Sequence, residues 1–338
     1  MNPEIENIDV SAIVNDFKDH FYSLVQQIPA GKLTTYGTMA EALGDKIAAR
    51  AVGKMLNENP RPIKVPCHRV VMADGHIGGF GMGIDKKFEL LKKEGVSFKA
   101  DHVIDLHKHL FTDFDSYAPL YKLRQYQDSL REKADMNDGF PNSDKIAGVD
   151  VSYNGDIGFA SVSLYQGIEE ISHHNITKQV YMPYIPTYLA FRETEIIHEL
   201  LNGLGEQPDI LLVDGNGILH PRGVGLATQL GIEMDIPTIG VAKSLLLGNL
   251  EREVTSDQNT SKIIYHDRVL GYALLSGGRA KNPVYISPGH KITPGSALEI
   301  VKRFSRYKVP EPIRKAHMNA NEYRIRQRNK HENTDVLP

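Results

Sequence analysis

The chain reads Ile146-Ala147-Gly148-Val149-Asp150-Val151-Ser152-Tyr153 near its middle, an apolar run interrupted by a single carboxylate. A short run rich in β-branched residues predicts a buried strand. Further strands are predicted at 157–165, 168–176, 210–213 and 237–241, with a helix at 187–204. Because helical segments alternate with these strands, we expect a mixed α/β sheet in the part of the chain that follows Pro141.

The first hundred residues follow a helical pattern instead. A helix is predicted at 15–27 from apolar residues at helical spacing, and Thr34-Thr35 is typical of the N-cap of a second helix, which Gly44 ends. A third helix is predicted from about 47 to 56, and a last one at 84–94. Two short helices joined by a glycine-containing turn predict a helix-turn-helix.

These two patterns predict two domains, at residues 1–98 and 117–338, joined by a linker at 99–116 that is rich in Asp and His. The length agrees, since 338 residues leave room for about two domains of about 100–200 residues each. The composition, 41% hydrophobic and 24% charged, is that of an ordinary globular protein. No run of about 18 apolar residues is present, so we expect no membrane span.

Charge and cysteine content narrow the class further. One cysteine cannot form an internal disulfide, and the acidic N-terminus does not resemble a signal peptide, so we expect a cytoplasmic protein. A net charge of −3 means that a nucleic-acid partner would be held by local basic patches. Residues 301–338, with ten Lys and Arg against four Asp and Glu, are either a solvated tail or a phosphate-binding segment. No oligomerisation signal stands out, and we expect a monomer.

The only cysteine, Cys67, lies in Val65-Pro66-Cys67-His68-Arg69-Val70-Val71. A lone cysteine in a chain of this length is usually an inert small core residue. Here the proline before it fixes the backbone, and His68 after it offers a base that can turn the thiol into the thiolate that attacks electrophiles. This heptapeptide therefore predicts covalent chemistry at Cys67.

Residues 11–98 resemble the DNA-binding and active-site domain of O6-alkylguanine-DNA alkyltransferases. The motifs that carry the resemblance are Pro66-Cys67-His68-Arg69-Val70, Ile28-Pro29-Ala30-Gly31-Lys32 with Thr35-Tyr36-Gly37, Ala49-Arg50-Ala51-Val52-Gly53, Asn59-Pro60 and Glu94-Gly95. The resemblance implies a mainly α, winged-helix-like fold and an alkyl transfer that needs no cofactor. Cys67 would be the nucleophile, His68 would relay its proton through water, and Glu94 would orient the histidine.

The same resemblance implies residues that handle the DNA. The target base is flipped out of the duplex, Arg50 fills the gap in the stack, and Tyr36 rotates the phosphate and donates to the base. Asn59 supports the hinge and the active-site turn. The bland alternative for Arg50 is a solvated charge on a helix.

Two departures from the alkyltransferase pattern stand out. The family usually carries an additional N-terminal domain, and only about ten residues precede this one. Phe80-Gly81-Met82-Gly83 falls where the family often has Tyr-Ser-Gly-Gly. Gly81 lacks a hydroxyl that would hydrogen-bond the base, and Met82 is expected to add bulk to the pocket rim. Related proteins that bind lesions without repairing them replace the cysteine, which this chain keeps.

Carboxylates at strand ends are the signal in the rest of the chain. Asp150 stands inside an apolar strand, and Asp214 stands at the exit of Ile210-Leu211-Leu212-Val213. Burying an aspartate costs several kcal/mol unless it is paired or bound to a metal. With Glu193 on a helix, these residues make a hard-oxygen site suited to Mg²⁺. The bland alternative for one such aspartate is a capping or turn role.

The surrounding residues resemble endonuclease V, which has a ribonuclease H-like α/β fold. The motifs are Ala147-Gly-Val-Asp-Val-Ser, Pro183-Tyr-Ile-Pro, Ala190-Phe-Arg-Glu, Val213-Asp-Gly-Asn-Gly, His220-Pro-Arg, Ile236-Pro-Thr-Ile-Gly-Val-Ala-Lys-Ser, Ser287-Pro-Gly-His and Pro310-Glu-Pro-Ile-Arg-Lys-Ala-His. The resemblance implies Asp150 and Asp214 as metal ligands. It implies Glu193 and His290 as further catalytic residues, with His290 near the metal or the water.

Contacts with nucleic acid are implied in the same way. Lys243 would contact the phosphate, and 183–186 would be a strand-separating wedge with Tyr184 stacking where the lesion left. Gly215 and Gly217 would let backbone amides approach the flipped base. The alternative is that these glycines have a structural role only, in a turn that needs their dihedral freedom.

Together these features predict a bifunctional DNA repair enzyme. One part would transfer an alkyl group irreversibly from O6-alkylguanine to Cys67. The other would nick the strand at the second phosphodiester bond 3′ to deoxyinosine, with Mg²⁺ as cofactor and Mn²⁺ as a substitute. Two alternatives stay open: the first part is only a lesion-binding module that recruits the nuclease, or the nuclease prefers inosine in RNA. The expected partners are thus damaged DNA or inosine-containing RNA, and no membrane.

Overall fold

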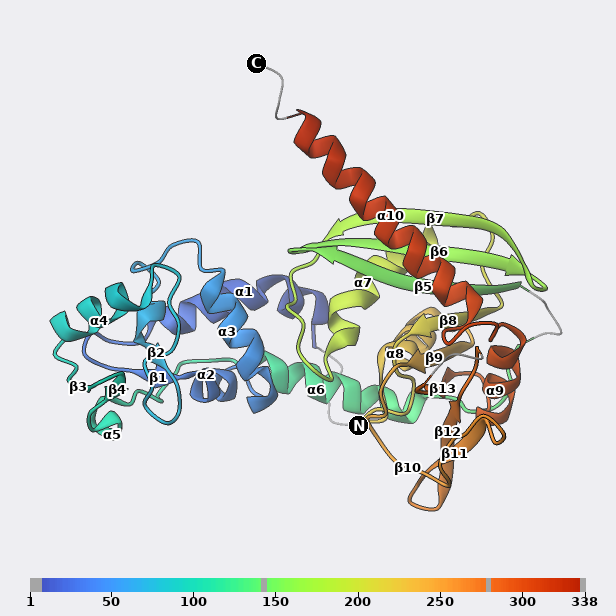
Figure 1. Ribbon diagram of the computed structural model, residues 1–338, viewed down its shortest axis with the longest axis horizontal. Helices are drawn as coiled ribbons and strands as arrows, with labels where there is room; N and C mark the ends of the chain where they lie inside the picture. The colour runs from blue at the N-terminus through green and yellow to red at the C-terminus, as the bar shows by residue number, and fades with distance from the viewer. Residues whose placement is uncertain (1–7, 141–144, 278–280, 335–338) are drawn as a thin grey trace. The chain divides into compact units, whose positions relative to one another are not determined.

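The computed structural model describes residues 8–140, 145–277 and 281–334, with side chains described to residue 329 (Figure 1). Contacts divide the chain into two compact units. The first holds the described residues up to Tyr126 together with Tyr181–Pro186, and the second holds Gln127–Val180 and the described residues from Thr187 onward. No helix in these described ranges combines the length and the apolar character needed to cross a bilayer.

The first unit is mainly helical. Its helices are α1 (Val10–Gln26), α2 (Tyr36–Ala42), α3 (Ala49–Asn57), α4 (Ile84–Lys93), α5 (Leu106–His109) and the start of α6 (Pro119–Leu130), with short 3₁₀ turns at Lys46–Ala48 and Cys67–Arg69. Two small strand pairs complete it: parallel β1 (Thr34–Thr35) and β2 (Val70–Val71), and antiparallel β3 (Phe98–Lys99) and β4 (His102–Val103).

The predicted helix-turn-helix is formed by α2 and α3. Thr35 caps α2 as expected, since its Oγ1 accepts a hydrogen bond from the Thr38 amide at 3.1 Å. Gly44 follows α2 with a φ of 103°, a left-handed conformation that favours glycine. A Cβ there would also lie 2.6 Å from the backbone nitrogen of Tyr121, so this turn has no room for a side chain.

The segment 99–116, predicted as a linker, is docked on the first unit. The Leu33 amide donates to the His109 carbonyl at 2.8 Å, and the Phe111 amide donates back to the Leu33 carbonyl at 2.7 Å. The Ile77 amide donates to the Asp101 carbonyl at 3.0 Å. The linker thus contributes strands and hydrogen bonds to the helical unit, while the predicted domain limits at 98 and 117 stay predictions.

The second unit is built on one mixed sheet, which has nine strands in the described part of the chain. The order across the sheet is β10-β11-β12-β13-β9-β8-β5-β6-β7. The strands are β5 (Lys145–Asn154), β6 (Ile157–Gln166), β7 (Glu169–Gln179), β8 (Ile210–Asp214), β9 (Thr238–Ala242), β10 (Asn249–Leu250), β11 (Thr260–Tyr265), β12 (Arg268–Leu274) and β13 (Val284–His290). β5, β8 and β9 are parallel neighbours, and the remaining pairs are antiparallel. This confirms the α/β mixed sheet and adds β10–β13, which were not predicted.

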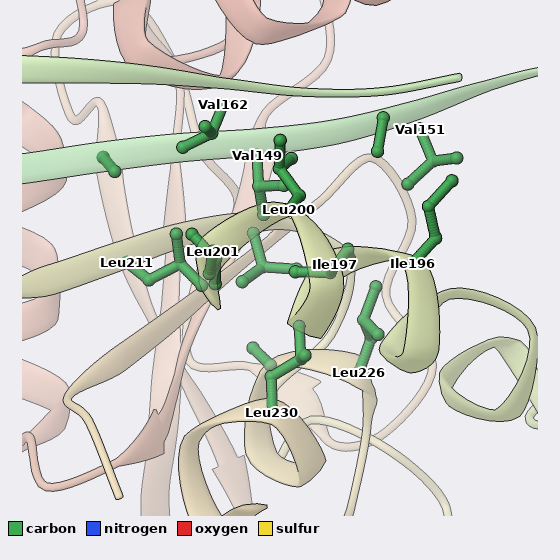
Figure 2. Packing of buried hydrophobic residues seen from close by; sticks show 14 of the residues in the cluster. Val149, Val151, Val162, Ile196, Ile197, Leu200, Leu201, Leu211, Leu226 and Leu230 are labelled. Carbon is green, nitrogen blue, oxygen red and sulfur yellow. The ribbon is translucent and has the colours of Figure 1, made fainter. Parts of the chain in front are cut away.

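Helices cover both faces of this sheet. One face packs against α7 (Leu189–Asn202) and α8 (Leu226–Met234), where Val149 and Val151 of β5 meet Ile196 and Leu200 of α7 (Figure 2). The other face packs against α9 (Pro294–Arg303) and the start of α10 (Glu311–Thr334). Fully burying each such aliphatic side chain contributes about 1.5–3 kcal/mol. The two cores hold β5 and β8 rigidly, and these strands carry the aspartates.

One contact sets the seat of α10 on the sheet. A Cβ at Gly148 of β5 would lie 2.2 Å from the carbonyl carbon of Pro312 and 2.4 Å from the amide nitrogen of Ile313. The backbone of α10 therefore rests directly on the backbone of β5. Only glycine at position 148 allows this approach.

Candidate active sites

The sole cysteine lies in a tight turn beside a cavity of the first unit. Cys67 begins the 3₁₀ turn after Pro66, and only 6% of its surface is exposed. The side-chain amide of Asn59 donates to the Val65 carbonyl and to Cys67 Sγ, both at 3.0 Å. A cavity of about 180 Å³ is lined by Tyr36, Gly53, Leu56, Asn57, Cys67, Gly79, Phe80 and Gly81. The structure thus places the thiol at the wall of a pocket, with Asn59 fixing its turn.

Glu94 ties together the groups around the thiol. Its carboxylate lies 3.0 Å from His68 Nε2, accepts hydrogen bonds from Arg69 at 2.8–3.2 Å, and accepts the Gly31 amide at 3.3 Å. Burial alone would raise the pKa of Glu94, but the hydrogen bonds from Arg69 and His68 hold it below its ordinary value. The predicted grouping of Cys67, His68 and Glu94 is therefore present.

The protonation states follow from burial. Burial raises the pKa of the Cys67 thiol and lowers the pKa of His68, so both groups are neutral near pH 7. His68 Nδ1 is buried and has no hydrogen-bond partner among the described residues. This nitrogen is therefore able to accept a proton.

Lys87 was missed in the sequence. It is fully buried on α4, where its ammonium donates to the carbonyls of Val70 at 2.6 Å and Gly79 at 3.1 Å. Burial lowers its pKa to about 8, and the nearby Cys67 opposes this shift. Its position one turn before the buried Leu91 was the available signal. Its charge lies close enough to favour a thiolate at Cys67.

Two of the predicted DNA-handling residues of the first unit, Tyr36 and Asn59, lie at this pocket or contact Cys67 beside it. Tyr36 lines it, and burial, followed by the proximity of Cys67, raises the pKa of Tyr36, which keeps it a hydrogen-bond donor. Arg50 is exposed on α3. Gly81 lines the cavity, but Met82 is 47% exposed and does not. The expected effect of Met82 on the pocket rim therefore stays a prediction.

In the second unit, the carboxylates meet where β5 runs past the end of β8. Val149 of β5 pairs with Val213 of β8, so the next residues, Asp150 and Asp214, are neighbours. Burial and then the charge of Asp214 raise the pKa of Asp150. Burial raises the pKa of Glu193 to about 8; Asp150 and Asp214 add to the shift, and a hydrogen bond from Tyr153 at 2.9 Å opposes it.

Two cationic or basic groups reach these aspartates. Lys243, which follows β9, places Nζ 2.6 Å from Asp214 Oδ2. Burial would lower the pKa of Lys243, but Asp214 raises it above its ordinary value. His317 of α10 places Nδ1 2.7 Å from Asp150 Oδ2. His317 was not predicted as a site residue, although it belongs to the quoted motif Pro310-Glu-Pro-Ile-Arg-Lys-Ala-His.

His290 does not join this cluster, contrary to expectation. It pairs with Thr238 at the start of β9, whereas Asp214 is level with Val241 three residues further on, about 10 Å away at the rise of a strand. His290 Nδ1 accepts the Asp135 amide at 3.1 Å, and its Nε2 lies 3.7 Å from Asp235. Because β13 runs antiparallel to β9, its last residue, His290, lies beside the start of β9, whereas Asp214 lies beside the end of β9.

The two glycines after Asp214 also differ from expectation. The Gly215 amide donates to the Val241 carbonyl at 3.2 Å, and the Gly217 amide donates to Ser287 Oγ at 2.9 Å. A Cβ at Gly217 would lie 2.1 Å from the Pro288 carbonyl oxygen. Both amides are therefore used by the fold itself, and close packing explains the need for glycine at position 217.

The predicted wedge has an exposed tip and a fixed base. Tyr184 is 57% exposed, while Pro183 and Ile185 on either side are buried. Thr187, which follows the wedge, has a φ of 68°, and the Arg222 guanidinium donates to its carbonyl and, at 2.9 Å, to its hydroxyl. Arg222 of the His220-Pro-Arg motif thereby holds the residue that follows the wedge.

The donor set of the second site fits a hard divalent cation. Asp150, Asp214 and Glu193 supply carboxylate oxygens. Burial first, and the neighbouring carboxylates after it, raise the pKa values of Asp150 and Glu193, and a bound cation would favour their charged forms. In the first unit, His76, Asp101 and His102 also bring three possible ligand atoms within 4.8 Å of one another. That group lies outside both sites, and His102 Nδ1 already lies 2.8 Å from Asp101 Oδ1.

Comparison with known proteins decides the family. The model of the endonuclease V family matches residues 128–318, and that of the 6-O-methylguanine DNA methyltransferase DNA-binding domain matches residues 16–96. A "Bifunctional methyltransferase/endonuclease" of Picrophilus torridus is 38% identical over 303 residues, which cover 89% of this chain and 95% of that relative. The chain belongs to the bifunctional methyltransferase/endonuclease family.

Other relatives of this bifunctional methyltransferase/endonuclease agree. The protein of the same description from Thermoplasma volcanium is 34% identical and covers 89% of this chain and 88% of that relative. The solved structure of the catalytic domain of human endonuclease V is 29% identical, with a TM-score of 0.58, and covers 63% of this chain and 98% of that one. An endonuclease V of Ciona intestinalis, solved with a DNA that contains inosine, is 28% identical with a TM-score of 0.56; it covers 61% of this chain and 98% of that one.

Proposed function

We propose that this bifunctional methyltransferase/endonuclease repairs two kinds of damaged base in DNA. The first unit transfers an alkyl group irreversibly from O6-alkylguanine to Cys67. The second unit nicks the strand at the second phosphodiester bond 3′ to deoxyinosine in a reaction that depends on Mg²⁺.

Alkyl transfer rests chiefly on the position of the Cys67 thiol at the wall of the cavity. The proton of the thiol passes to His68 Nδ1, the free nitrogen of a ring whose other nitrogen is held on Glu94. The thiolate then attacks the alkyl carbon: a carbon–sulfur bond forms, the carbon–O6 bond breaks, and its electron pair stays on the guanine. The departing guanine takes back the proton from His68. Lys87 stabilises the thiolate by its charge.

Strand nicking rests chiefly on the proximity of Asp150, Asp214 and His317 at the carboxyl end of β8, beside β5. Mg²⁺, with Mn²⁺ as a substitute, would be held by Asp150 and Asp214, and it would supply Lewis-acid activation of the phosphate and of water. Lys243 lies beside Asp214, where its charge can stabilise a phosphate. His317 is placed to move a proton, and Glu193, with a pKa of about 8, can hold one.

Parallel incubation with two lesion duplexes tests both activities. One duplex carries labelled O6-methylguanine, and the other carries one deoxyinosine, with a matched RNA containing inosine for comparison. We expect the label to move to the wild-type protein and not to Cys67→Ala, and we expect the inosine DNA to be nicked only with a divalent metal.

Each part of this proposal has its own failing outcome. A wild-type protein that acquires no label is a lesion-binding module, a result that the missing hydroxyl at Gly81 on the cavity wall would then explain. Faster cutting of the RNA would reassign the nuclease substrate. No cut in either nucleic acid with Mg²⁺ would remove the nuclease from the proposal.

A further inference from the structure

Two histidines of the first unit, His76 and His102, lie side by side on neighbouring segments of the chain. They form an antiparallel bridge, and the backbone hydrogen bonds of 2.9 and 3.0 Å on either side of it join their chain neighbours rather than the histidines themselves. A cross-strand pair of this kind holds its two side chains especially close on one face. The two imidazole rings accordingly have their centroids 3.6 Å apart.

Asp101 adds a carboxylate to this pair. Its Oδ1 lies 2.8 Å from His102 Nδ1, and its Oδ2 lies 3.8 Å from His76 Nε2. The three side chains each offer one ligand atom, and these atoms lie within 4.8 Å of one another. Ligand atoms held at about 2.0–2.2 Å from a tetrahedral ion are about 3.3–3.6 Å apart. Small side-chain rotations are therefore enough for the group to close on an ion.

A further carboxylate lies on the far side of the His76 ring. His76 Nδ1 lies 2.9 Å from Asp74 Oδ2, while the His76 amide donates to Asp74 Oδ1 at 3.1 Å. A histidine that ligates a metal almost always has its other ring nitrogen turned toward a carboxylate, a backbone carbonyl or a water. Asp74 gives His76 this arrangement, since it takes Nδ1 and leaves Nε2 on the side of Asp101.

The donor set selects the class of ion. The pKa values of Asp74 and Asp101 lie below their ordinary value, because the His76 amide bonds to the first and the His102 ring bonds to the second. Imidazole together with carboxylate suits Zn²⁺ and its neighbours among the transition metals, whereas Mg²⁺ prefers oxygen ligands alone. The side chains of His76, His102 and Asp101 are between 41% and 57% exposed, so an ion has access and water can complete its coordination.

We infer that His76, Asp101 and His102 bind a divalent transition-metal ion of the Zn²⁺ class, with Asp74 as a positioning residue for His76. The inference does not rest on either proposed activity. The ion fastens the docked segment that begins at residue 99 to the turn around His76. That turn lies between β2 and Gly79 on the wall of the Cys67 cavity, so the ion has a structural role beside the alkyl-transfer site.

Equilibrium dialysis against Zn²⁺ tests the site. The full chain with Asp150→Ala and Asp214→Ala serves as the parent, which removes the carboxylates of the nuclease site. We expect the parent to bind one Zn²⁺, and the further double change His76→Gln with His102→Gln to weaken binding by at least about 100-fold. Asp74→Asn should weaken it by about 10–100-fold. His107→Gln, an exposed histidine on the same docked segment, is the matched control and should bind as the parent does.

Unfolding of the first unit provides a second measurement. Zn²⁺ at 100 times its Kd should raise the ratio of folded to unfolded parent by about 100-fold, and Mg²⁺ at the same concentration should not. Cys67→Ala in the parent should keep the Zn²⁺ affinity, which separates this site from the thiol. Three outcomes would overturn the inference: no saturable binding near one ion per parent chain, unchanged affinity in the double histidine variant, or equal stabilisation by Mg²⁺. If the double variant does not fold, the parent titration and Asp74→Asn decide, since unchanged affinity in Asp74→Asn also contradicts the site.

Discussion

The two active sites treat partly or fully buried carboxylates in opposite ways. In the first unit, Glu94 is surrounded by donors from Arg69, His68 and Gly31, and its pKa lies below the ordinary value. In the second unit, burial and then the neighbouring carboxylates raise the pKa values of Asp150 and Glu193 above their ordinary values. A carboxylate whose partners are all protein groups can orient a base without further help. Carboxylates that repel one another are arranged to receive a cation. Alkyl transfer thus needs only protein groups, whereas nicking needs a metal ion.

Variants that disable one site and spare the other test this comparison most strongly. Asp150→Ala or Asp214→Ala should lower nicking by at least about 10³-fold, because each removes a metal-binding oxygen, and should leave alkyl transfer unchanged. Cys67→Ala should do the reverse. Label transfer and nicking measured on the same preparations check this. Loss of both activities in one aspartate variant would show that the two units do not act independently.

Two histidines of the second unit, His290 and His317, sharpen the comparison at the aspartate cluster. His317→Ala should lower the nicking rate by about 10²–10⁴-fold, the range expected when a group that transfers a proton is removed. His290→Ala is the matched control and should stay within about twofold of wild type, because His290 lies at the other end of the sheet. Single-turnover nicking rates decide the matter. A larger loss in His290→Ala than in His317→Ala would contradict the placement described above.

Lys87 offers the smallest effect, through the dependence of stability on pH. Its pKa is about 8 in the folded protein and close to the ordinary 10.5 when unfolded. Between these values the unfolded chain binds the extra proton, so the free energy of unfolding should rise with pH, by up to about 1.4 kcal/mol per pH unit. Below pH 8 both states are protonated, and the cost of burying the charge is fully felt.

Lys87→Met removes this titration. Denaturant unfolding between pH 8 and 10.5, followed for the first unit, should therefore show a steeper rise for wild type than for the variant. Exposed Lys93→Met, on the same helix, serves as the control and should track wild type. Identical pH slopes in all three proteins would mean that Lys87 is charged in the folded state across this range.

Local signals in the sequence were enough for the elements that they describe. The cap at Thr35 fixed the start of α2, and the apolar run 210–213 identified β8, because both depend on residues within a few positions of each other. The strands β10–β13 depend on partners far along the chain, and a bulge between Ile263 and Ile264 interrupts the alternation of one of them. No short window of sequence contains that information.

The site residues divide along the same line. Cys67 and His68 are adjacent in sequence, and Asp150 and Asp214 each end or interrupt an apolar strand, so their chemistry was visible. The sequence did not show which of His290 and His317 lies at the aspartates. That depends on the direction of β13 and on how α10 crosses β5, and His317 is 167 residues away from Asp150 in the sequence. A buried lysine such as Lys87 likewise requires the packed structure.

The seat of α10 on Gly148 has a consequence for how this family can vary. Because the helix backbone rests on a strand position without a side chain, even one added methyl group would lift the helix that delivers His317 to Asp150. We therefore expect position 148 and residues 312–313 at the start of α10 to vary together. Among relatives, any larger residue at 148 should be accompanied by a compensating change at the start of the helix. A nuclease with a larger residue at 148 and no such change should keep its fold, but its histidine should no longer reach the aspartate.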